Sequence, residues 1–467
     1  MSKKVFILLP DGIGLRNFAF TKFLDFGKAL GYEVVFWNNV TFNFTEIGSN
    51  EIKIKNYKLH MLTDFFKVAK IQIELNLFQK RYQDKVYDTY RFPLKTDSLK
   101  SIIKYNISKL IIILFNSEKG IQRIEKIINW LERRTQYYDN CYKTLLKEKP
   151  EFIFCTNQRH IITIAPLLAA KKLHIPTATF IFSWDNLPKA TMIVSTDYYF
   201  VWSNFMRQEI LKYYPKINAN QICVTGTTQF EPHFDKSILI DKNTFFKKYN
   251  LDTSKVYICF SGDDVTTSPD DHQYLENVAN SVKKLNDKGN SIGIIFRRSP
   301  VDFSDRYDIV LHKYKDVVVP INPLWKQNGE SWNTVMPTVE DLQLQVNIIS
   351  NSAFVVNIAS SMVFDFAAFN KPCFYINYNS ENKRIKEWNS QTIYNFVHFR
   401  SMPSKDCVFW LNSPEEIEDK FESFLNSNGR GVIENAKKWF KIINQHPPDK
   451  ASERIWKSIE DIIYKNR

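Results

Sequence analysis

The sequence predicts an α/β protein with two doubly wound parallel-sheet domains that face a cleft. The first observation is length, because 467 residues are enough for two ordinary domains, each with its own core. The second is a strand-and-helix alternation that occurs twice along the chain and favours parallel sheets with crossover helices. The third is composition, since 44% hydrophobic and 15% aromatic residues are typical of packed globular proteins.

The first domain is expected to span residues 1–235. It opens with "KVFILLP", "DGIGLRN", "FAFTKFLDFGKALG" and "YEVVFWNN", which we interpret as strand, turn, helix and strand. Residues 50–150 carry apolar side chains at spacings of three and four, and this pattern predicts a helical insert. The alternation resumes with the strand "PEFIFC", the helix "IITIAPLLAAKKLHIP" and the strands "TATFIF", "YYFVW" and "QICV".

The second domain is expected to span residues 236–430. Its predicted strands are "VYICFS", "SIGIIFRR", "DVVVP", "AFVVNI" and "KPCFYI", with helices such as "DHQYLENVANSVKKLND" and "MVFDFAAFN" between them. Residues 431–467 read as a helical tail, which we expect to pack back on the first domain. No internal repeat or low-complexity segment interrupts the pattern.

The formal net charge of +13 suits nucleic acid, an anionic membrane surface or a phosphorylated substrate. The lysines are scattered along helical stretches and no nucleic-acid-binding motif accompanies them, so we expect no nucleic-acid partner. The six cysteines stand far apart, several of them inside apolar runs such as "VYICF". This arrangement is typical of buried free thiols rather than of a disulfide framework.

Localisation is predicted from the apolar runs. "VFILLP" is too short for a secretion signal, and "KLIIILF" is far shorter than a membrane-spanning helix, so a cytoplasmic protein is expected. The lysines that flank "KLIIILF" suit a peripheral contact with the inner face of the membrane. An ordinary core helix is the alternative, and the sequence leaves both open.

The turn "DGIGLRN" raises the question of a dinucleotide site. Gly12 and Gly14 fit the first two positions of G-x-G-x-x-G, but Asn17 takes the third, and the following strand ends in "FWNN" without a ribose-binding acid. Both differences from the motif argue against a NAD-binding site. Either the turn only needs glycine's backbone freedom, or it brings Asp11 to the ligand-binding carboxyl edge of a parallel sheet.

The segment "FVVNIASSMVFDFAAFNKPCFYI" predicts a second ligand-binding turn. Ser360 and Ser361 fall between a buried strand and a helix, where unpaired N–H groups favour a phosphate. Asp365 lies one turn further on, as a ribose-binding acid would. The alternative is that the two serines are helix caps and Asp365 is an ordinary first-turn acid.

This segment resembles the donor-nucleotide site of GT-B glycosyltransferases and of the related non-hydrolysing nucleotide-sugar epimerases, with "NKP" in place of their "GKP"-like turn. The phrases "CTNQRH", "FIFSWDNLPKA", "YFVWSNFMRQEI" and "ICVTGTTQFEPHF" are similar to ones in bacterial glycosyltransferases of surface-polysaccharide assembly and in glycerophosphate transferases. The resemblance covers most of the chain except residues 50–150. Serines replace the usual glycines at 360 and 361, and Asp365 replaces the usual glutamate.

The resemblance implies two Rossmann-like domains, with residues 1–235 on the acceptor side and residues 236–430 binding the nucleotide-sugar donor. It implies transfer of a sugar from that donor, with a UDP-sugar favoured, to a glycan or lipid-linked acceptor in surface-polysaccharide synthesis. The reaction is expected to be metal-independent, with no cofactor, because no D-x-D motif stands where a metal-dependent transferase would show one. It is expected to be inverting if a carboxylate of the first domain acts as the base. The leaving diphosphate is expected to bind near Ser360 and Ser361. Arg297 and Arg298, at the end of "GIIFRR", can add a forked donor pair.

Three residues are candidates for the catalytic base: Asp11, then Asp185 of "SWDNLP", then His160. Asp185 also suits an ordinary turn, and His160 an ordinary polar loop. Three rival functions stay open: a nucleotide-sugar epimerase, a CDP-glycerol-type glycerophosphate transferase, and a catalytically silent nucleotide-binding scaffold.

Overall fold

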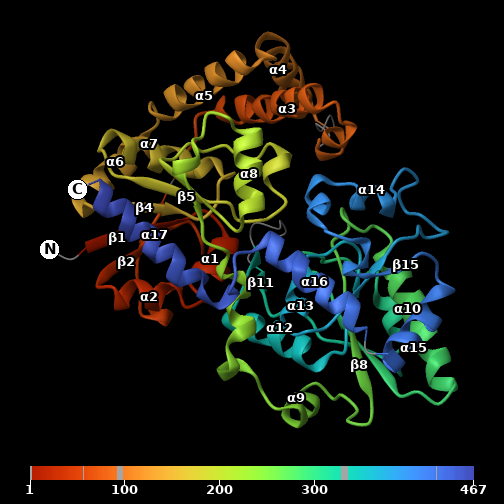
Figure 1. Cartoon of the computed structure of the whole chain (residues 1–467). Coiled ribbons are helices and arrows are strands. Elements are labelled where there is room, and N and C mark those ends of the chain that lie inside the picture. Colours follow the sequence, from red (N-terminus) through yellow and green to blue (C-terminus); the bar gives the residue numbers. More distant parts are fainter. Residues whose placement is uncertain (1–2, 56, 92–97, 328–334, 428, 467) are drawn as a thin grey trace. The chain divides into compact units, whose positions relative to one another are not determined.

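The computed structural model describes residues 3–55, 57–91, 98–327, 335–427 and 429–466 (Figure 1). The chain divides into two compact units. Unit 1 comprises Met1–Thr228 and Ile443–Arg467, and unit 2 comprises Gln229–Ile442. Each unit is built on its own parallel sheet with helices, so the predicted two-domain α/β fold is confirmed.

The sheet of unit 1 has seven parallel strands in the order β3-β2-β1-β4-β5-β6-β7. Residues Val5 to Leu9 of the interior strand β1 are fully buried, as expected for a strand covered by helices on both faces. The strands are β1 (Lys3–Leu9), β2 (Tyr32–Asn38), β3 (Asn50–Lys53), β4 (Phe152–Cys155), β5 (Thr177–Phe180), β6 (Tyr198–Val201) and β7 (Ile222–Val224).

The helices of unit 1 include the predicted insert. They are α1 (Gly12–Phe18), α2 (Phe23–Ala29), α3 (Thr63–Tyr82), α4 (Leu99–Phe115), α5 (Glu118–Glu132), α6 (Gln136–Glu148), α7 (Ile164–Lys172), α8 (Asn204–Tyr213) and α17 (Ala451–Lys465). Helices α3, α4 and α5 of the insert contact one another (Figure 1). The segment predicted as helical starts with a strand instead, because Asn50–Lys53 add β3 to the edge of the sheet beside β2.

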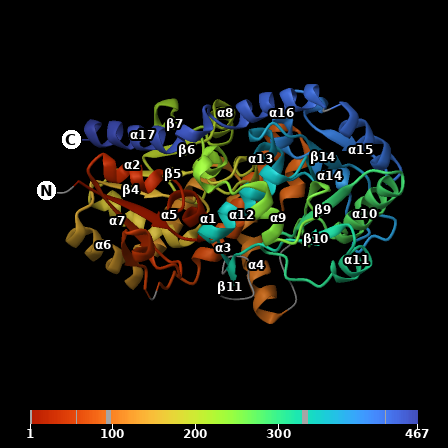
Figure 2. The same cartoon turned by 90° about the horizontal axis from the view of Figure 1, so that it is seen from below.

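The C-terminal helix α17 packs on α2 in unit 1 (Figure 2). The Trp456 ring stacks on Phe23 and Tyr32, with ring centroids 5.0 and 5.3 Å away, and its Nε1 donates to Phe23 O at 2.6 Å. A Cβ at Gly27 would lie 2.2 Å from the Trp456 ring, so only glycine allows this close approach. The contact buries a large aromatic side chain and joins the two ends of the chain.

The sheet of unit 2 has six parallel strands in the order β10-β9-β8-β13-β14-β15. These strands are β8 (Val256–Ser261), β9 (Ile292–Arg297), β10 (Val318–Pro320), β13 (Val355–Asn357), β14 (Cys373–Ile376) and β15 (Phe409–Leu411). A short antiparallel pair, β11 (Lys326–Gln327) and β12 (Val335–Met336), lies outside this sheet. The helices are α9 (Lys242–Lys248), α10 (Asp271–Asp287), α11 (Asp308–Lys313), α12 (Val339–Asn351), α13 (Met362–Ala368), α14 (Ser390–Tyr394), α15 (Glu416–Ser427) and α16 (Arg430–Ile443).

Two further expectations concern the thiols and the membrane. All six cysteines are free and five of them are buried, with Cys223 partly exposed, so the prediction of unpaired thiols is confirmed. Across the described ranges, no helix combines the length and the apolar character needed to cross a bilayer.

Candidate functional site

The switch point of the first sheet lies between β1 and β4, because the connection from β1 leads to β2 on one side while β4 pairs on the other. Open α/β sheets bind ligands at the carboxyl ends of the strands at such a point. Asp11 follows β1, and Asn157 follows β4. The Asn157 Nδ2 donates to Asp11 Oδ2 at 2.5 Å, and both side chains are buried. The structure therefore places the first candidate base at the switch point.

The segment after β1 that was predicted as a turn is the helix α1, because the Asp11 carboxylate caps its first N–H groups, and its Gly14 has a packing role. Asp11 is the N-cap of α1, and its Oδ1 accepts from Ile13 N at 3.1 Å and from Gly14 N at 3.4 Å. A Cβ at Gly14 would lie 2.4 Å from the Thr156 Oγ1. Glycine at this position lets α1 approach the end of β4.

His160 and Arg159 lie in the loop that leaves β4, close to Asp11. Burial lowers the pKa of His160, although the Asp11 carboxylate acts in the opposite direction. Among the described residues, the buried His160 Nδ1 has no hydrogen-bond partner. Burial also lowers the pKa of Arg159, opposed by Asp11 and Asp185. Asp11, His160 and Asp185 follow β1, β4 and β5, which are neighbours in the parallel sheet, so all three predicted base candidates lie at its carboxyl edge.

Asp185 is held by its own loop after β5. Its Oδ1 accepts from Ser183 Oγ at 2.6 Å and from Asn186 Nδ2 at 2.8 Å, and its Oδ2 pairs with Lys189. Gln158 bridges this loop to the one after β4, since its Nε2 donates to Asn186 Oδ1 at 3.0 Å. Both Asp185 oxygens are engaged, which makes this carboxylate a weaker base candidate than the sequence suggests.

The second sheet has its switch point between β8 and β13. The predicted serines lie in the turn after β13, where Ser360 N donates to Asn357 Oδ1 at 3.0 Å and the Tyr375 hydroxyl donates to Ser360 O at 2.9 Å. Ala359 adopts a φ of 52°, a left-handed conformation that is uncommon outside glycine. Ser360 Oγ accepts from Met362 N at 3.3 Å, while the Ser361 side chain makes no capping bond. Both serines are half-buried at the carboxyl edge.

The two predicted phosphate-binding arginines have different surroundings. Arg297 is buried, and its Nη2 donates to both carboxylate oxygens of Asp341 at 3.0 and 2.8 Å. Its Nη1 is buried and has no partner within the described part of the chain. Arg298 donates through Nη2 to Ser304 O at 2.9 Å, and its guanidinium lies over the Tyr307 ring. Arg297 is thus already paired with a carboxylate through Nη2, while its Nη1 is available to a ligand.

Asp365 forms a buried contact with His233. His233 Nε2 and Asp365 Oδ1 are 2.5 Å apart, and both side chains are almost fully buried. The partner residue comes from the 3-10 helix Thr228–Phe234 at the start of unit 2. One oxygen of the predicted ribose-binding acid is therefore occupied by a histidine.

A buried network holds the loop after β8. Arg306 donates to Asp263 O at 2.5 Å and pairs with Asp302 at 2.7 Å. The Tyr307 hydroxyl and Asp263 N both bond to Asp271 Oδ2, at 2.7 and 3.0 Å. Burial raises the pKa of Asp271, and burial with nearby carboxylates raises that of Asp263 well above its ordinary value. This loop lies at the same carboxyl edge as the serine turn.

The lysine of the "NKP" turn caps a helix. Lys371 Nζ donates to the carbonyl oxygens of Ile349 and Ser350 at 2.7 Å each, where α12 ends. Burial lowers the pKa of this lysine to about 8. In this structure Lys371 therefore supplies hydrogen-bond donors to two carbonyl oxygens at the end of a helix, which have no partner within the helix itself.

Sequence reasoning did not single out Asn157, His233, Asp341 and Arg306 as site residues. A position directly after a strand would have identified Asn157 as a carboxyl-edge residue. His233 carries no such signal, because its partner is 132 residues away in the chain. In the described ranges, no three His, Cys, Asp or Glu side chains are grouped as metal ligands.

No protein-family model matches the sequence, and a comparison with curated proteins finds no match. Solved structures do match. The chain is similar to S. aureus MnaA in a structure with UDP, with a TM-score of 0.55 at 12% identity over 99% of this chain and 97% of that one. It is similar to a UDP-N-acetylglucosamine 2-epimerase, with a TM-score of 0.54 at 12% identity over 100% and 98% of the two chains.

A glycosyltransferase from Rickettsia africae ESF-5 is also similar, with a TM-score of 0.52 at 11% identity over the whole of both chains. The TM-scores of these three structures indicate a common fold, whereas identities of 11–12% do not determine the activity of this chain. The chain therefore has the two-domain, Rossmann-like GT-B fold that the sequence resemblance implied.

Proposed function

We propose that this chain is a glycosyltransferase that moves a sugar from a nucleotide-sugar donor, with a UDP-sugar favoured, to a glycan or lipid-linked acceptor in surface-polysaccharide synthesis. The observation that carries the proposal is the fold likeness over nearly the whole chain. The similar structures include one with UDP, one of a UDP-N-acetylglucosamine epimerase and one of a glycosyltransferase. Polar residues at both sheet switch points support it, since such points are where α/β sheets bind ligands.

Unit 2 is assigned the donor nucleotide. The turn after β13 presents the Ser360 and Ser361 hydroxyls beside backbone N–H groups, which suit a diphosphate. Arg297 Nη1 offers a further donor. Such groups stabilise negative charge on the departing diphosphate because they are already oriented before the reaction.

Unit 1 is assigned the base, and His160 has the most suitable surroundings. Burial lowers its pKa, which favours the neutral imidazole that can accept a proton. The nearby Asp11 carboxylate stabilises the imidazolium that would form. Asp11 itself already caps α1 and binds Asn157, so we assign it a positioning role beside His160.

The proposed step is an inverting displacement. The acceptor hydroxyl oxygen forms a bond to the anomeric carbon of the sugar as the bond from that carbon to the diphosphate oxygen breaks. The hydroxyl proton passes to the base, and the nucleoside diphosphate leaves with the electron pair. We propose that the step needs no metal and no other cofactor, so EDTA should leave the transfer rate unchanged.

A nucleotide-sugar epimerase is the second candidate, favoured by the likeness to the UDP-N-acetylglucosamine 2-epimerase. It would use the same nucleotide site but no acceptor. A transferase releases nucleoside diphosphate only when an acceptor is present, whereas an epimerase converts the sugar without one. Product analysis of UDP-sugars incubated with and without glycan acceptors distinguishes the two.

A peripheral membrane contact is also proposed for unit 1. Helix α4 carries Ile103, Leu110, Ile113 and Leu114, each more than half exposed, at spacings that place them on one side of the helix. The exposed Lys109 lies among them and favours anionic headgroups. Such a surface would bring the chain to a lipid-linked acceptor.

Nucleotide binding is the first experiment. Thermal shifts with UDP, GDP, CDP, TDP, CMP and NAD are measured on the wild type, on Ser361→Trp and on the control Ser423→Trp, which lies exposed on α15. We expect UDP to raise the Tm of the wild type and the control but not of Ser361→Trp, because a ligand that binds only the folded state stabilises it. A preference for cytidine nucleotides would favour the glycerophosphate transferase, and nucleotide binding without turnover would favour the scaffold.

A further inference from the structure

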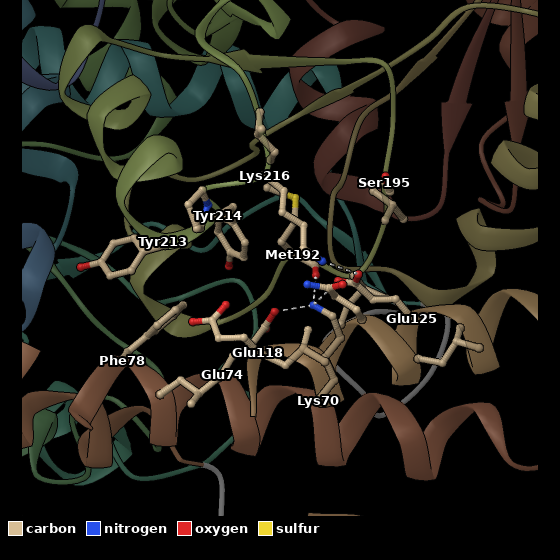
Figure 3. A pocket seen from close by; sticks show the side chains of 18 of the residues that line it. Lys70, Glu74, Phe78, Glu118, Glu125, Met192, Ser195, Tyr213, Tyr214 and Lys216 are labelled. Atoms are coloured by element: carbon tan, nitrogen blue, oxygen red, sulfur yellow. Dashed lines mark hydrogen bonds and ion pairs between the residues drawn. The ribbon is translucent and has the colours of Figure 1, made fainter. Parts of the chain in front are cut away.

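Unit 1 contains a pocket with a volume of about 310 Å³ whose lining includes none of Asp11, His160 and Asp185. Its walls come from α3, α5, the segment 192–195 and the end of α8 with the residues that follow it (Figure 3). Small-molecule sites usually have at least this volume. Nothing in the proposed transfer uses this pocket so far.

One wall of the pocket carries a buried ion pair on α3. Lys70 Nζ donates to Glu74 Oε1 at 2.6 Å and to Met192 O at 2.8 Å (Figure 3). Glu74 is 4% exposed, and its Oε2 has no hydrogen-bond partner in the parts of the chain that the structure describes. A buried carboxylate oxygen without a partner is costly, and a ligand that donates a hydrogen bond to it removes that cost.

Aromatic rings line the pocket next to this carboxylate. Phe78 lies one turn after Glu74 on α3, and its ring centroid is 4.8 Å from that of Tyr213. The hydroxyls of the three lining tyrosines are occupied: Tyr213 bonds to Tyr87 at 3.0 Å, Tyr214 donates to Leu187 O at 3.3 Å, and Tyr199 accepts from Thr196 N at 3.3 Å. The rings therefore act as apolar surface rather than as hydrogen-bonding groups.

The charges of the lining residues nearly balance. Four cations face three carboxylates: Lys70, Arg81, Lys126 and Lys216 against Glu74, Glu118 and Glu125. Most of these charges are already paired, as in Lys70 with Glu74 and Arg81 with Glu118. A phosphate would find a surplus of only one cation, and a lipid chain would meet too many polar groups. A sugar ring fits both the unpartnered Glu74 oxygen and the aromatic rings of the lining. Its hydroxyls can donate to the carboxylate, and its C–H faces can pack on the rings.

The pocket is connected to the base candidates through the main chain. Ile193 N and Val194 N, in the wall of the pocket, both donate to Gln158 O. Gln158 lies between Asn157 and the Arg159–His160 pair, and its side chain bonds to Asn186 beside Asp185. A ligand that fills the pocket would therefore contact a segment that is hydrogen-bonded to the candidate catalytic loop.

We propose that this pocket binds one hexose residue of the glycan acceptor, with a hydroxyl donating to Glu74 Oε2 and the ring packed on Phe78 and Tyr213. The acceptor role of this pocket rests on the proposed glycosyltransferase function. The binding of a hexose to the pocket is independent of that function. Burial raises the pKa of Glu74 to about 7, so the carboxyl can accept from or donate to a sugar hydroxyl near neutral pH.

Saturation-transfer NMR tests the proposal directly, with the methyl glycosides of glucose, galactose and N-acetylglucosamine as probes. Gln122→Trp fills the pocket from α5, and Ser195→Trp fills it from the opposite wall. Arg123→Trp is the matched control, because Arg123 is exposed on the same helix and does not line the pocket. We expect at least one glycoside to give signals from its ring protons with the wild type and the control, and both pocket variants to reduce those signals to background.

Absence of a signal from all three glycosides with the wild type would overturn the proposal. Full signals in both pocket variants would overturn it as well, since the sugar would then bind elsewhere. A thermal unfolding transition, measured on the same samples, shows that each variant is folded, and the shift of its Tm with UDP tests the proposed function separately. If a glycoside binds at the pocket but UDP does not shift the Tm, the hexose site is supported and its role as an acceptor subsite is rejected.

Discussion

Asn157 Nδ2 lies 2.5 Å from Asp11 Oδ2, and this contact joins the loops that follow β1 and β4 at the switch point of the first sheet. The two residues are 146 positions apart in the chain. The same carboxylate caps α1 through its other oxygen. Asp11 thus holds the local helix and a distant loop together beside His160.

Replacing Asp11 or Asn157 by alanine should destabilise unit 1. Asp11→Ala removes an N-cap and leaves a buried amide without an acceptor, for an expected loss of about 2 to 4 kcal/mol. Asn157→Ala removes the same contact, so the double variant should be less destabilised than the sum of the two single variants. Urea unfolding of all four proteins measures the coupling, which we expect to be about 1 to 3 kcal/mol. Strict additivity would show that the contact contributes nothing.

Gly14→Ala should lower the Tm whether or not a ligand is bound. The added Cβ would meet Thr156 Oγ1 at 2.4 Å and Leu9 Cδ2 at 2.5 Å, and overpacking of this kind typically costs about 1 to 3 kcal/mol. Gly431→Ala is the control, because nothing lies within 4 Å of its added Cβ in α16. A Gly14→Ala variant as stable as the wild type that loses only UDP binding would instead give the start of α1 a ligand-binding role.

The His233–Asp365 contact separates a structural role of Asp365 from a nucleotide-binding one. Asp365→Asn and His233→Gln both weaken the same buried contact and should lower the Tm. If Asp365 also binds the ribose, Asp365→Asn should lose at least about tenfold in UDP affinity, or ~1.4 kcal/mol, while His233→Gln keeps most of it. Isothermal titration with UDP measures both. Equal affinities in the two variants would assign Asp365 to structure alone.

Glu74 should make the stability of the chain depend on pH. Burial raises its pKa from the ordinary value near 4.5 to about 7. Between these values the folded state keeps a proton that the unfolded state has released, so this group's contribution to stability falls as the pH rises. Glu74→Gln removes the titration.

The Tm of Glu74→Gln minus that of the wild type should therefore increase from pH 4.5 to pH 7. Scanning fluorimetry at half-unit pH steps measures the difference. Glu434→Gln, at an exposed carboxylate, reports the effect of removing one surface charge. A difference that stays flat or declines with pH would contradict the assignment of this titration to Glu74.

The exposed apolar residues of α4 predict binding to anionic vesicles. The wild type should sediment with phosphatidylglycerol vesicles at low salt, and the double variant Leu110→Glu/Leu114→Glu should bind at least tenfold more weakly. Ile309→Glu is the control, because Ile309 is 81% exposed on α11 of unit 2. Failure of the wild type to sediment, or equal binding by the double variant, would assign α4 to another role.

Local sequence patterns determined the two parallel sheets of this protein and the positions of several candidate site residues along them. The alternation of apolar runs with helical periodicity predicted the two parallel sheets, because strands buried on both faces are continuously apolar and crossover helices need a period near 3.6. The positions of Asp11, Ser360 and Asp365 directly after strands or at helix starts placed them at the carboxyl edges. The edge strand β3 was missed, since a short and partly polar strand such as Asn50–Lys53 has no strong local signal.

The tertiary structure alone decided what those residues contact. Asn157 meets Asp11, His233 meets Asp365 and Asp341 meets Arg297 across 146, 132 and 44 positions, and no periodicity spans such separations. The pocket beside Lys70 and Glu74 is also formed by segments distant in the sequence. A sequence specifies the pattern of each element, whereas the side-chain partners depend on the packing of elements that sequence order does not bring together.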